Sequence, residues 1–255
     1  MQGFGLIVIG DELLSGKRRD KHFAHLLSLL STRGLELRWV RFISDDAPLI
    51  TQTLRETRAG MDVVFSCGGI GATPDDRTRQ CAAEAWGVTT QPHPEGMQAL
   101  EARFGRPVEP PHRVRLVEFP SGARLIPNPI NQIPGFSLDR HHFLPGFPNM
   151  AWPMMAWVLD NEYHDWQDAD RLAEQAIGVE GARESDVIPL LERFEQANPT
   201  LRLSCLPNTR AKGFSLELGL RGAPDEVAEG MQVLQQEIAA LGFAWQPIVI
   251  GQPHE

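Results

Sequence analysis

Strand-like apolar runs alternate with helical segments over the first part of the chain, and this alternation constrains the fold most strongly. Phe4–Ile9 and Met61–Cys67 are largely apolar runs of strand length, and Leu35–Ile43 is a third predicted strand. Helical patterns fill the intervals, at Lys21–Arg33 and at about Asp46–Arg58. Strands separated by helices are typical of a mostly parallel sheet covered on both faces. We therefore expect an α/β domain.

Residues that commonly begin or terminate helices support these boundaries. Asp20 and Asp46 precede the two helices as caps, and Gly34 follows the first helix. Val108–Pro120, rich in proline and charge, is not assigned to a helix or a strand. The other helices and strands of this domain are predicted at Asp76–Trp86, Pro94–Phe104, Ala123–Ile126, His142–Leu144 and Met150–Leu159.

A polar segment with four acidic residues, Asn161–Asp170, separates the first part of the chain from the rest. The order of elements after it is β-α-β-β-α-β, which is typical of a ferredoxin-like fold. These elements are predicted at Leu172–Ile177, Glu184–Asn198, Leu201–Pro207, Phe214–Arg221, Asp225–Leu241 and Ala244–Ile250. We therefore expect two domains, residues 1–165 and residues 171–255, the second a small α+β domain.

Charge and composition exclude several classes of function. The 24 basic and 33 acidic residues give a net charge of −9, which disfavours general binding of nucleic acid. Cys67, Cys81 and Cys205 are widely spaced, so a zinc site or a disulfide framework is not expected. No apolar run approaches membrane-spanning length, and the N-terminus lacks a basic leader. We expect a cytoplasmic protein that does not contact membranes.

The most informative motif is Gly68-Gly69-Ile70-Gly71-Ala72-Thr73-Pro74-Asp75-Asp76, hereafter the glycine loop, between a predicted strand and a predicted helix. Its glycines allow a close approach to a ligand, and the N–H groups that begin the next helix favour an anion. Asp75 and Asp76 suit a phosphate only with a cation between them, and Mg²⁺ binds in this way. The loop therefore indicates a phosphorylated ligand held through Mg²⁺. The alternative is a tight turn in which both aspartates are helix caps.

Two more acidic motifs are expected at the same edge of the sheet. Gly10–Gly16, with Asp11 and Glu12, follows the first predicted strand, and Asp45-Asp46 follows the second. Ligands of open α/β sheets bind outside the carboxyl ends of the strands. Asp11 and Glu12 are therefore candidate site residues, whereas a helix cap is the preferred interpretation of the Asp45-Asp46 pair.

Two groups of basic residues have ordinary interpretations. His141 and His142 have no spaced partner and are interpreted as surface or loop histidines. For the cations after Gly16, contact with ligand phosphates and a solvated basic turn are equally supported. These cations are Arg18, Arg19 and Lys21.

Together the motifs resemble the molybdopterin-binding domain shared by molybdenum-cofactor biosynthesis proteins of the MoaB/MogA type and the N-terminal part of CinA, the competence/damage-inducible protein. The matching stretches, in the family's order over about the first 160 residues, are Gly10–Gly16, Gly68–Thr78, Asn128-Pro129, Pro134-Gly135-Phe136 and Leu144-Pro145-Gly146. The resemblance implies a three-layer α/β/α sandwich with a pocket for a pterin or an adenine nucleotide, usually with Mg²⁺. The second domain is similar to the small domain that follows in CinA.

We expect Asp11, Asp75 and Asp76 to be catalytic, with Asp75 and Asp76 also as Mg²⁺ ligands. The residues expected to bind the ligand or its phosphate are Gly10, Glu12, Gly68, Gly69, Gly71, Thr73, Thr78, Asn128, Pro134, Gly135, Pro145 and Gly146. Family members form dimers or trimers, so a homo-oligomer is expected.

Related domains adenylylate molybdopterin or, in CinA-type proteins, hydrolyse ADP-ribose, so the resemblance implies a Mg²⁺-dependent nucleotidyltransferase or pyrophosphatase. Three positions depart from the family pattern: Ala72 stands where many members have a proline, Asn131 replaces a glycine, and Asn149 stands where a glutamate is common. Without the carboxylate at position 149, the alternative is a non-catalytic regulatory protein that binds a pterin or nucleotide. The C-terminal amidohydrolase domain of many CinA proteins is not expected, because the chain ends at Glu255.

Overall fold

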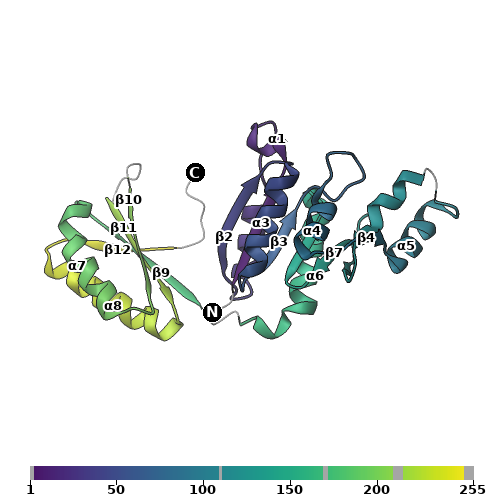
Figure 1. Cartoon of the computed structure of the whole chain (residues 1–255). Coiled ribbons are helices and arrows are strands. Elements are labelled where there is room, and N and C mark those ends of the chain that lie inside the picture. The colour runs from purple at the N-terminus through teal and green to yellow at the C-terminus, as the bar shows by residue number, and fades with distance from the viewer. Residues whose placement is uncertain (1–2, 109–110, 169–171, 209–214, 250–255) are drawn as a thin grey trace. The chain divides into compact units, whose positions relative to one another are not determined.

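The computed structural model describes residues 3–108, 111–168, 172–208 and 215–249 (Figure 1). The chain forms two compact units, Met1–Gln167 and Asp168–Glu255. The ends of two predicted strands, Phe214 and Ile250, lie outside the described residues. None of the helices in the described part of the chain has both the length and the apolar composition needed to cross a bilayer.

A six-stranded, mostly parallel sheet forms the centre of the first unit, and this confirms the predicted α/β fold class. Its strand order is β2-β1-β3-β8-β7-β6. The four strands β2, β1, β3 and β8 are parallel, and β7 is antiparallel to both of its neighbours. The bounds are β1 Phe4–Ile9, β2 Leu37–Ile43, β3 Val63–Cys67, β6 Arg124–Ile126, β7 Gly135–Leu138 and β8 His141–Leu144.

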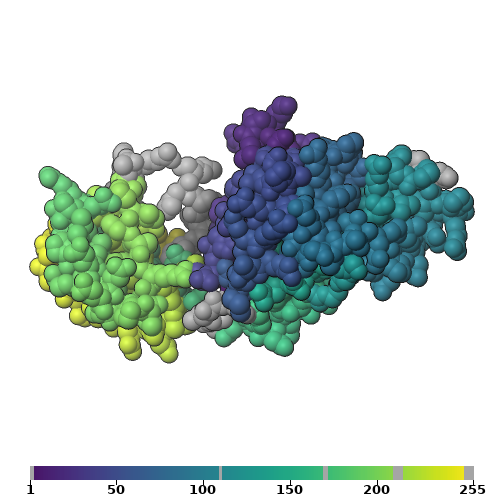
Figure 2. All heavy atoms as spheres, in the orientation of Figure 1, coloured from purple at the N-terminus to yellow at the C-terminus, as the bar shows by residue number. Residues whose placement is uncertain are grey.

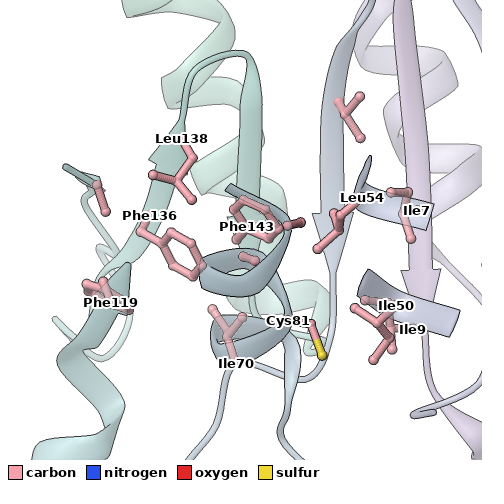
Figure 3. Close-up of a cluster of buried hydrophobic side chains, with 14 of the residues drawn as sticks. Ile7, Ile9, Ile50, Leu54, Ile70, Cys81, Phe119, Phe136, Leu138 and Phe143 are labelled. Carbon is pink, nitrogen blue, oxygen red and sulfur yellow. The ribbon is translucent and has the colours of Figure 1, made fainter. Parts of the chain in front are cut away.

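Helices cover the sheet on both faces. On one face, α3 (Ala47–Ala59) and α4 (Thr78–Trp86) pack against strand residues such as Ile7 and Phe143, and Figure 3 shows this apolar cluster. On the opposite face, α2 (His22–Ser31) and α6 (Pro148–Glu162) enclose a second apolar cluster. Successive strand residues point to opposite faces, so a continuously apolar strand such as β1 supplies both clusters.

Shorter elements complete the first unit. A four-residue helix, α1 (Asp11–Leu14), follows β1 directly. The short strands β4 (Thr90–Pro92) and β5 (Glu118–Pro120) pair with each other beside α5 (Pro94–Phe104). Two 3₁₀ helices are present, η1 (Pro111–Val117) and η2 (His164–Trp166). The predicted strands include none of β4, β5 and β7.

The second unit has the predicted β-α-β-β-α-β order. Its sheet order is β10-β11-β9-β12 with antiparallel neighbours, which is the ferredoxin-like arrangement. The bounds are β9 Ala173–Val179, α7 Glu184–Ala197, β10 Arg202–Pro207, β11 Leu216–Gly222, α8 Pro224–Ala240 and β12 Trp245–Ile248. Residues of both helices pack against the sheet in one apolar core.

The adjacent histidines of β8 are buried, so their interpretation as surface or loop residues is wrong. His141 and His142 are 2% and 0% exposed, because β8 lies inside the sheet between β3 and β7. The His141 Nε2 lies 2.9 Å from the Thr57 hydroxyl. The His142 Nδ1 lies 2.8 Å from the Ser137 hydroxyl, and its Nε2 lies 2.9 Å from the Tyr163 hydroxyl. These contacts replace hydrogen bonds to water at three of the four ring nitrogens, and the His141 Nδ1 has no partner among the described residues.

We predict that the first unit loses stability in mild acid because of this pair. Burial lowers the pKa of His141 and of His142 from 6.5 to about 3. The unfolded chain binds these protons below about pH 6.5 and the folded chain only near pH 3. The free energy of unfolding is therefore highest above pH 6.5 and decreases as the pH falls, by on the order of 2 kcal/mol per histidine at pH 5.

Urea unfolding between pH 5 and pH 7.5 measures this dependence. His142→Gln should reduce the change in unfolding free energy with pH, and His112→Gln, which removes an exposed histidine, serves as the reference. An equal pH dependence in both variants would contradict the assignment.

Candidate functional site

The predicted site residues follow the carboxyl ends of the parallel strands, which meet at one edge of the sheet. We call this edge the rim. β2 and β3 lie on opposite sides of β1. The connection that follows β1 therefore leads to one side of this strand, and the connection that follows β2 leads across to the other side. Such a switch point is where open α/β sheets bind ligands. The segment around α1 projects from the surface of the first unit at the rim (Figures 1 and 2).

The backbone at the start of the glycine loop requires glycine. Gly68 and Gly69 have φ angles of 112° and 68°, a left-handed region that side chains rarely adopt. A Cβ on Gly68 would collide with the carbonyl oxygen of Ile9, and a Cβ on Gly69 would collide with the Thr78 hydroxyl. The loop therefore packs against the end of β1 and against the first residue of α4.

Hydrogen bonds within the loop fix its shape. The Thr78 hydroxyl donates to the Gly68 carbonyl and the Thr78 N–H donates to the Gly69 carbonyl, each at 3.0 Å. One carboxylate oxygen of Asp76 accepts from the Thr73 N–H at 3.0 Å and from the Thr73 hydroxyl. Asp76 thus stabilises the loop itself, and Asp75 is exposed beside it.

A buried arginine that the sequence pattern does not reveal holds the glycine loop through a backbone carbonyl. Arg79 is 1% exposed, and its guanidinium donates to the carbonyl of Ile70 at 3.0 Å and to that of Arg115. Burial lowers the pKa of Arg79. Arginine is usually exposed, and no local pattern distinguishes a buried one.

At the rim, Asp11 and Asp45 contact each other's backbone, and the charge of Asp75 acts on Asp45. The Asp45 carboxylate accepts from the Asp11 N–H at 2.9 Å, and the Asp11 carboxylate accepts from the Asp45 N–H at 3.3 Å. Burial raises the pKa of Asp45, and the charges of Asp11, Glu12 and Asp75 raise it further. The structure therefore groups acidic residues that follow β1, β2 and β3.

Asp45 and Asp46 have different structural roles. The Asp46 carboxylate accepts from the Leu49 N–H at 3.0 Å and caps α3, as predicted. Asp45 belongs to the acidic group instead, so the cap interpretation is wrong for this residue. Its proximity to Asp11 depends on the pairing of β1 with β2, which places the ends of both strands side by side.

The predicted residues between β6 and β7 lie farther along the rim. The Asn128 side chain accepts from the N–H groups of Ile130, at 3.0 Å, and Asn131, at 3.4 Å, and so closes a turn. Gly135 belongs to β7, where a Cβ would collide with the carbonyl oxygen of Phe143. Strand β8 lies between this region and the strand that leads into the glycine loop.

Among the described residues, no group of three or more His, Cys, Asp or Glu side chains is arranged to hold a metal ion. Protein groups alone therefore do not form a complete metal site in that part of the chain. The exposed Asp75 and the carboxylates near it fit Mg²⁺ only when phosphate oxygens and waters complete the coordination, which is the usual mode of Mg²⁺ binding.

A pocket of about 300 Å³ lies at the ends of β1 and β3, between the segment after α1 and the start of α2. Its apolar wall consists of Val8, Ile9, Leu13, Cys67 and Pro148. Burial raises the pKa of the Cys67 thiol, so this side chain contributes an uncharged surface. We call it the rim pocket.

Gly146 and a set of charged and polar residues form the rest of the rim pocket, and these residues are Glu12, Arg18, Arg19, Asp20, Lys21 and His22. Three exposed cations at one opening of an acidic protein provide local attraction for an anion. Their position in the pocket favours the ligand-contact interpretation of these cations. His22 is 3% exposed, and its Nε2 lies 3.1 Å from the Gly146 carbonyl oxygen.

Residues 5–164 match the sequence profile of a family described as "probable molybdopterin binding domain". A CinA-like protein of Geobacter metallireducens is 31% identical over 207 residues, which are 78% of this chain and 50% of that protein. A protein of Pyrobaculum arsenaticum is 28% identical over 232 residues, 88% of this chain and 84% of its own. The crystal structure of CinA from Thermoplasma acidophilum superposes with a TM-score of 0.56 and 25% identity, covering 64% of this chain and 97% of that one.

Other CinA-like relatives are considerably longer than the matching region. The CinA-like protein of Anaeromyxobacter sp. strain K is 35% identical over 150 residues, 56% of this chain and 36% of its own length. The chain thus spans between a third and a half of these CinA-like relatives.

We predict that Gly69→Ala destabilises the first unit more than Gly87→Ala. Both glycines have left-handed φ angles near 70°, but a Cβ at Gly87 meets only open space, whereas one at Gly69 collides with Thr78. Strain alone costs about 1 kcal/mol, and the collision adds roughly 1–3 kcal/mol. Urea unfolding of both variants measures the difference, and equal losses would contradict the loop geometry described above.

Proposed function

The chain belongs to the family of probable molybdopterin-binding domains, and from this premise we propose that its rim binds the phosphate group of a pterin or nucleotide and promotes Mg²⁺-dependent chemistry there. The observation that carries the proposal is the contact of Asp11 with Asp45, together with Asp75 of the rigid glycine loop, whose charge raises the pKa of Asp45. Molybdopterin and adenine nucleotides are the proposed ligands.

Different residues of the rim are proposed to bind the phosphate and the cation. The N–H groups of the glycine loop and at the start of α4 favour phosphate oxygens. Asp75 is exposed, so its carboxylate is ionised and available to a cation at neutral pH. Mg²⁺, when bound, supplies positive charge that offsets the negative charge developing on the phosphate oxygens. Asp11 and Asp45 hold the loops after β1 and β2 together.

Two reactions fit this arrangement, adenylyl transfer to the phosphate of molybdopterin and hydrolysis of the pyrophosphate of ADP-ribose. Both need a phosphate cradle and a cation held by carboxylates, and both develop negative charge on phosphate oxygens. The rim supplies these features for either ligand.

A second candidate function is non-catalytic binding of a pterin or nucleotide. The observation that favours it is Asn149, in the first turn of α6, which lacks the carboxylate that is common in the family at this position. A protein with this site would retain the phosphate cradle and respond to its ligand without turnover.

We predict that Asp75→Asn lowers turnover of ADP-ribose, or of molybdopterin with ATP, by roughly 100-fold or more, because it removes a charged metal ligand. Asp46→Asn is the matched control: asparagine caps helices as well as aspartate, so α3 and the activity should be retained. Product formation with Mg²⁺ is measured by chromatography. Full activity of both Asp75→Asn and Asp76→Asn would reject the assignment. If the unmodified protein binds its ligand without forming product, the second candidate is supported.

We further propose that the second unit is a small domain of CinA type.

We also propose that the first unit forms a homo-oligomer, a dimer or a trimer. Most apolar residues of α6 belong to the core, but α2 leaves Phe23 and Leu27 41% and 42% exposed. Light scattering after size exclusion should show a dimer or a trimer, and Leu27→Glu should shift it towards the monomer. A monomer at micromolar concentration would contradict this proposal.

A further inference from the structure

Arg79 is a buried cation whose hydrogen-bond partners are backbone carbonyls. It is the second residue of α4 and is 1% exposed. Its guanidinium donates to the Ile70 carbonyl of the glycine loop, at 3.0 Å, and to the Arg115 carbonyl of η1. Among the described residues it forms no ion pair, and its Nε has no hydrogen-bond partner. A positive charge therefore contacts the glycine loop from the interior without a paired carboxylate.

The charge of Arg79 is retained despite its burial. Burial lowers the pKa of Arg79, and the charges of Asp76 and Glu118 partly offset this effect. A guanidinium nevertheless stays protonated in folded proteins. A buried charge without a paired partner is costly, and groups perturbed in this way cluster at functional sites. Arg79 also acts through its charge on Asp76, a residue of the loop that we propose to bind phosphate.

The hydrogen bond to Ile70 sets the direction of the next N–H group along the chain. The peptide bond between Ile70 and Gly71 is trans, and in a trans peptide the C=O and N–H groups point in opposite directions. Because the Ile70 carbonyl points to the buried Arg79, the Gly71 N–H points away from this side chain. Gly71 is half-buried, and its N–H has no hydrogen-bond partner among the described residues. It is therefore a donor that a ligand can use.

The surroundings of Gly71 connect this donor with the proposed site. A Cβ on Gly71 would collide with the Asp76 carboxylate, so Gly71 lies beside one of the proposed Mg²⁺ ligands. An anion that accepts from the Gly71 N–H is attracted by the charge of Arg79, which lies on the other side of the same peptide.

We propose that Arg79 is a positioning residue for the phosphate group of the ligand. Its hydrogen bond to Ile70 holds the Gly71 N–H outward as a donor to a phosphate oxygen, and its buried charge stabilises the bound anion. The second hydrogen bond, to Arg115, fixes the guanidinium against η1. This inference rests on the proposed function and adds to it the residue that gives the glycine loop its affinity for phosphate.

Nuclear magnetic resonance of the full chain tests this role with inorganic phosphate, in the presence of Mg²⁺, as the probe. In the unmodified chain, phosphate should move the Gly71 amide proton downfield and slow its exchange with water, because this proton gains an acceptor. The Gly87 amide, which donates to the Glu84 carbonyl at the other end of α4, is the internal reference and should not move.

Two variants separate the charge and the hydrogen bond of Arg79 from the bulk of its side chain. Arg79→Met keeps a long side chain without charge or donor, and should weaken phosphate binding by about tenfold or more. Arg79→Lys keeps the charge and a donor but lacks the planar fork that reaches two carbonyls, and should weaken it only about threefold. Arg55→Met, the matched control, removes an exposed cation that pairs with Glu84, and should bind phosphate as the unmodified chain does.

Unchanged phosphate binding by a folded Arg79→Met variant would show that Arg79 only supports the fold, and would overturn the inference. If Arg79→Met does not fold, Arg79→Lys and the unmodified chain decide. A Gly71 amide that exchanges slowly before phosphate is added, or that does not respond to phosphate, overturns the inference in either case.

Adenosine diphosphate ribose separates this inference from the proposed function. Mg²⁺-dependent binding of ADP-ribose that requires Asp75 but is unchanged in the Arg79 variants would overturn the inference and leave the proposed function intact. Binding that requires Arg79 but neither Mg²⁺ nor Asp75 would reject the proposed Mg²⁺-dependent chemistry alone.

Discussion

The left-handed backbone at Gly68 and Gly69 is the constraint on which the geometry of the rim depends. It lets the chain turn directly at the end of β3, in contact with the Ile9 carbonyl of β1 and with Thr78 of α4. A side chain at either glycine would push these elements apart. Because the turn is tight, Asp75 comes close enough to Asp45 for its charge to raise the pKa of that carboxyl.

Acidic and basic side chains are both present at this edge of the sheet. Asp11, Asp45 and Asp75 form an acidic group near the ends of β1, β2 and β3, whereas the cations after α1 surround the opening of the rim pocket. Glu12 belongs to both regions, since it contributes to the pKa of Asp45 and is part of the pocket. The proposed ligand, an uncharged ring with a phosphate bound through a cation, matches this separation of apolar, basic and acidic surfaces.

Local signals were enough to predict the main elements, because apolar periodicity and helix caps such as Asp46 act within a few residues. β7 is absent from the predicted strands because it follows a proline-rich segment, and its fit against β8 is a tertiary contact. The burial of His141, Arg79 and His22 was also not predicted. Each depends on neighbours distant in the sequence, such as Thr57 for His141 and Gly146 for His22, which no local pattern reveals.

The claim that a phosphate binds at the glycine loop through Mg²⁺ is tested most directly by calorimetric titration of the full chain with molybdopterin, ADP-ribose and ATP, each with and without Mg²⁺. The account predicts that at least one of them binds, and that removal of Mg²⁺ weakens this binding strongly, since the acidic group at the rim repels an uncompensated phosphate. Binding of none of the three, or binding of equal strength without Mg²⁺, would contradict it.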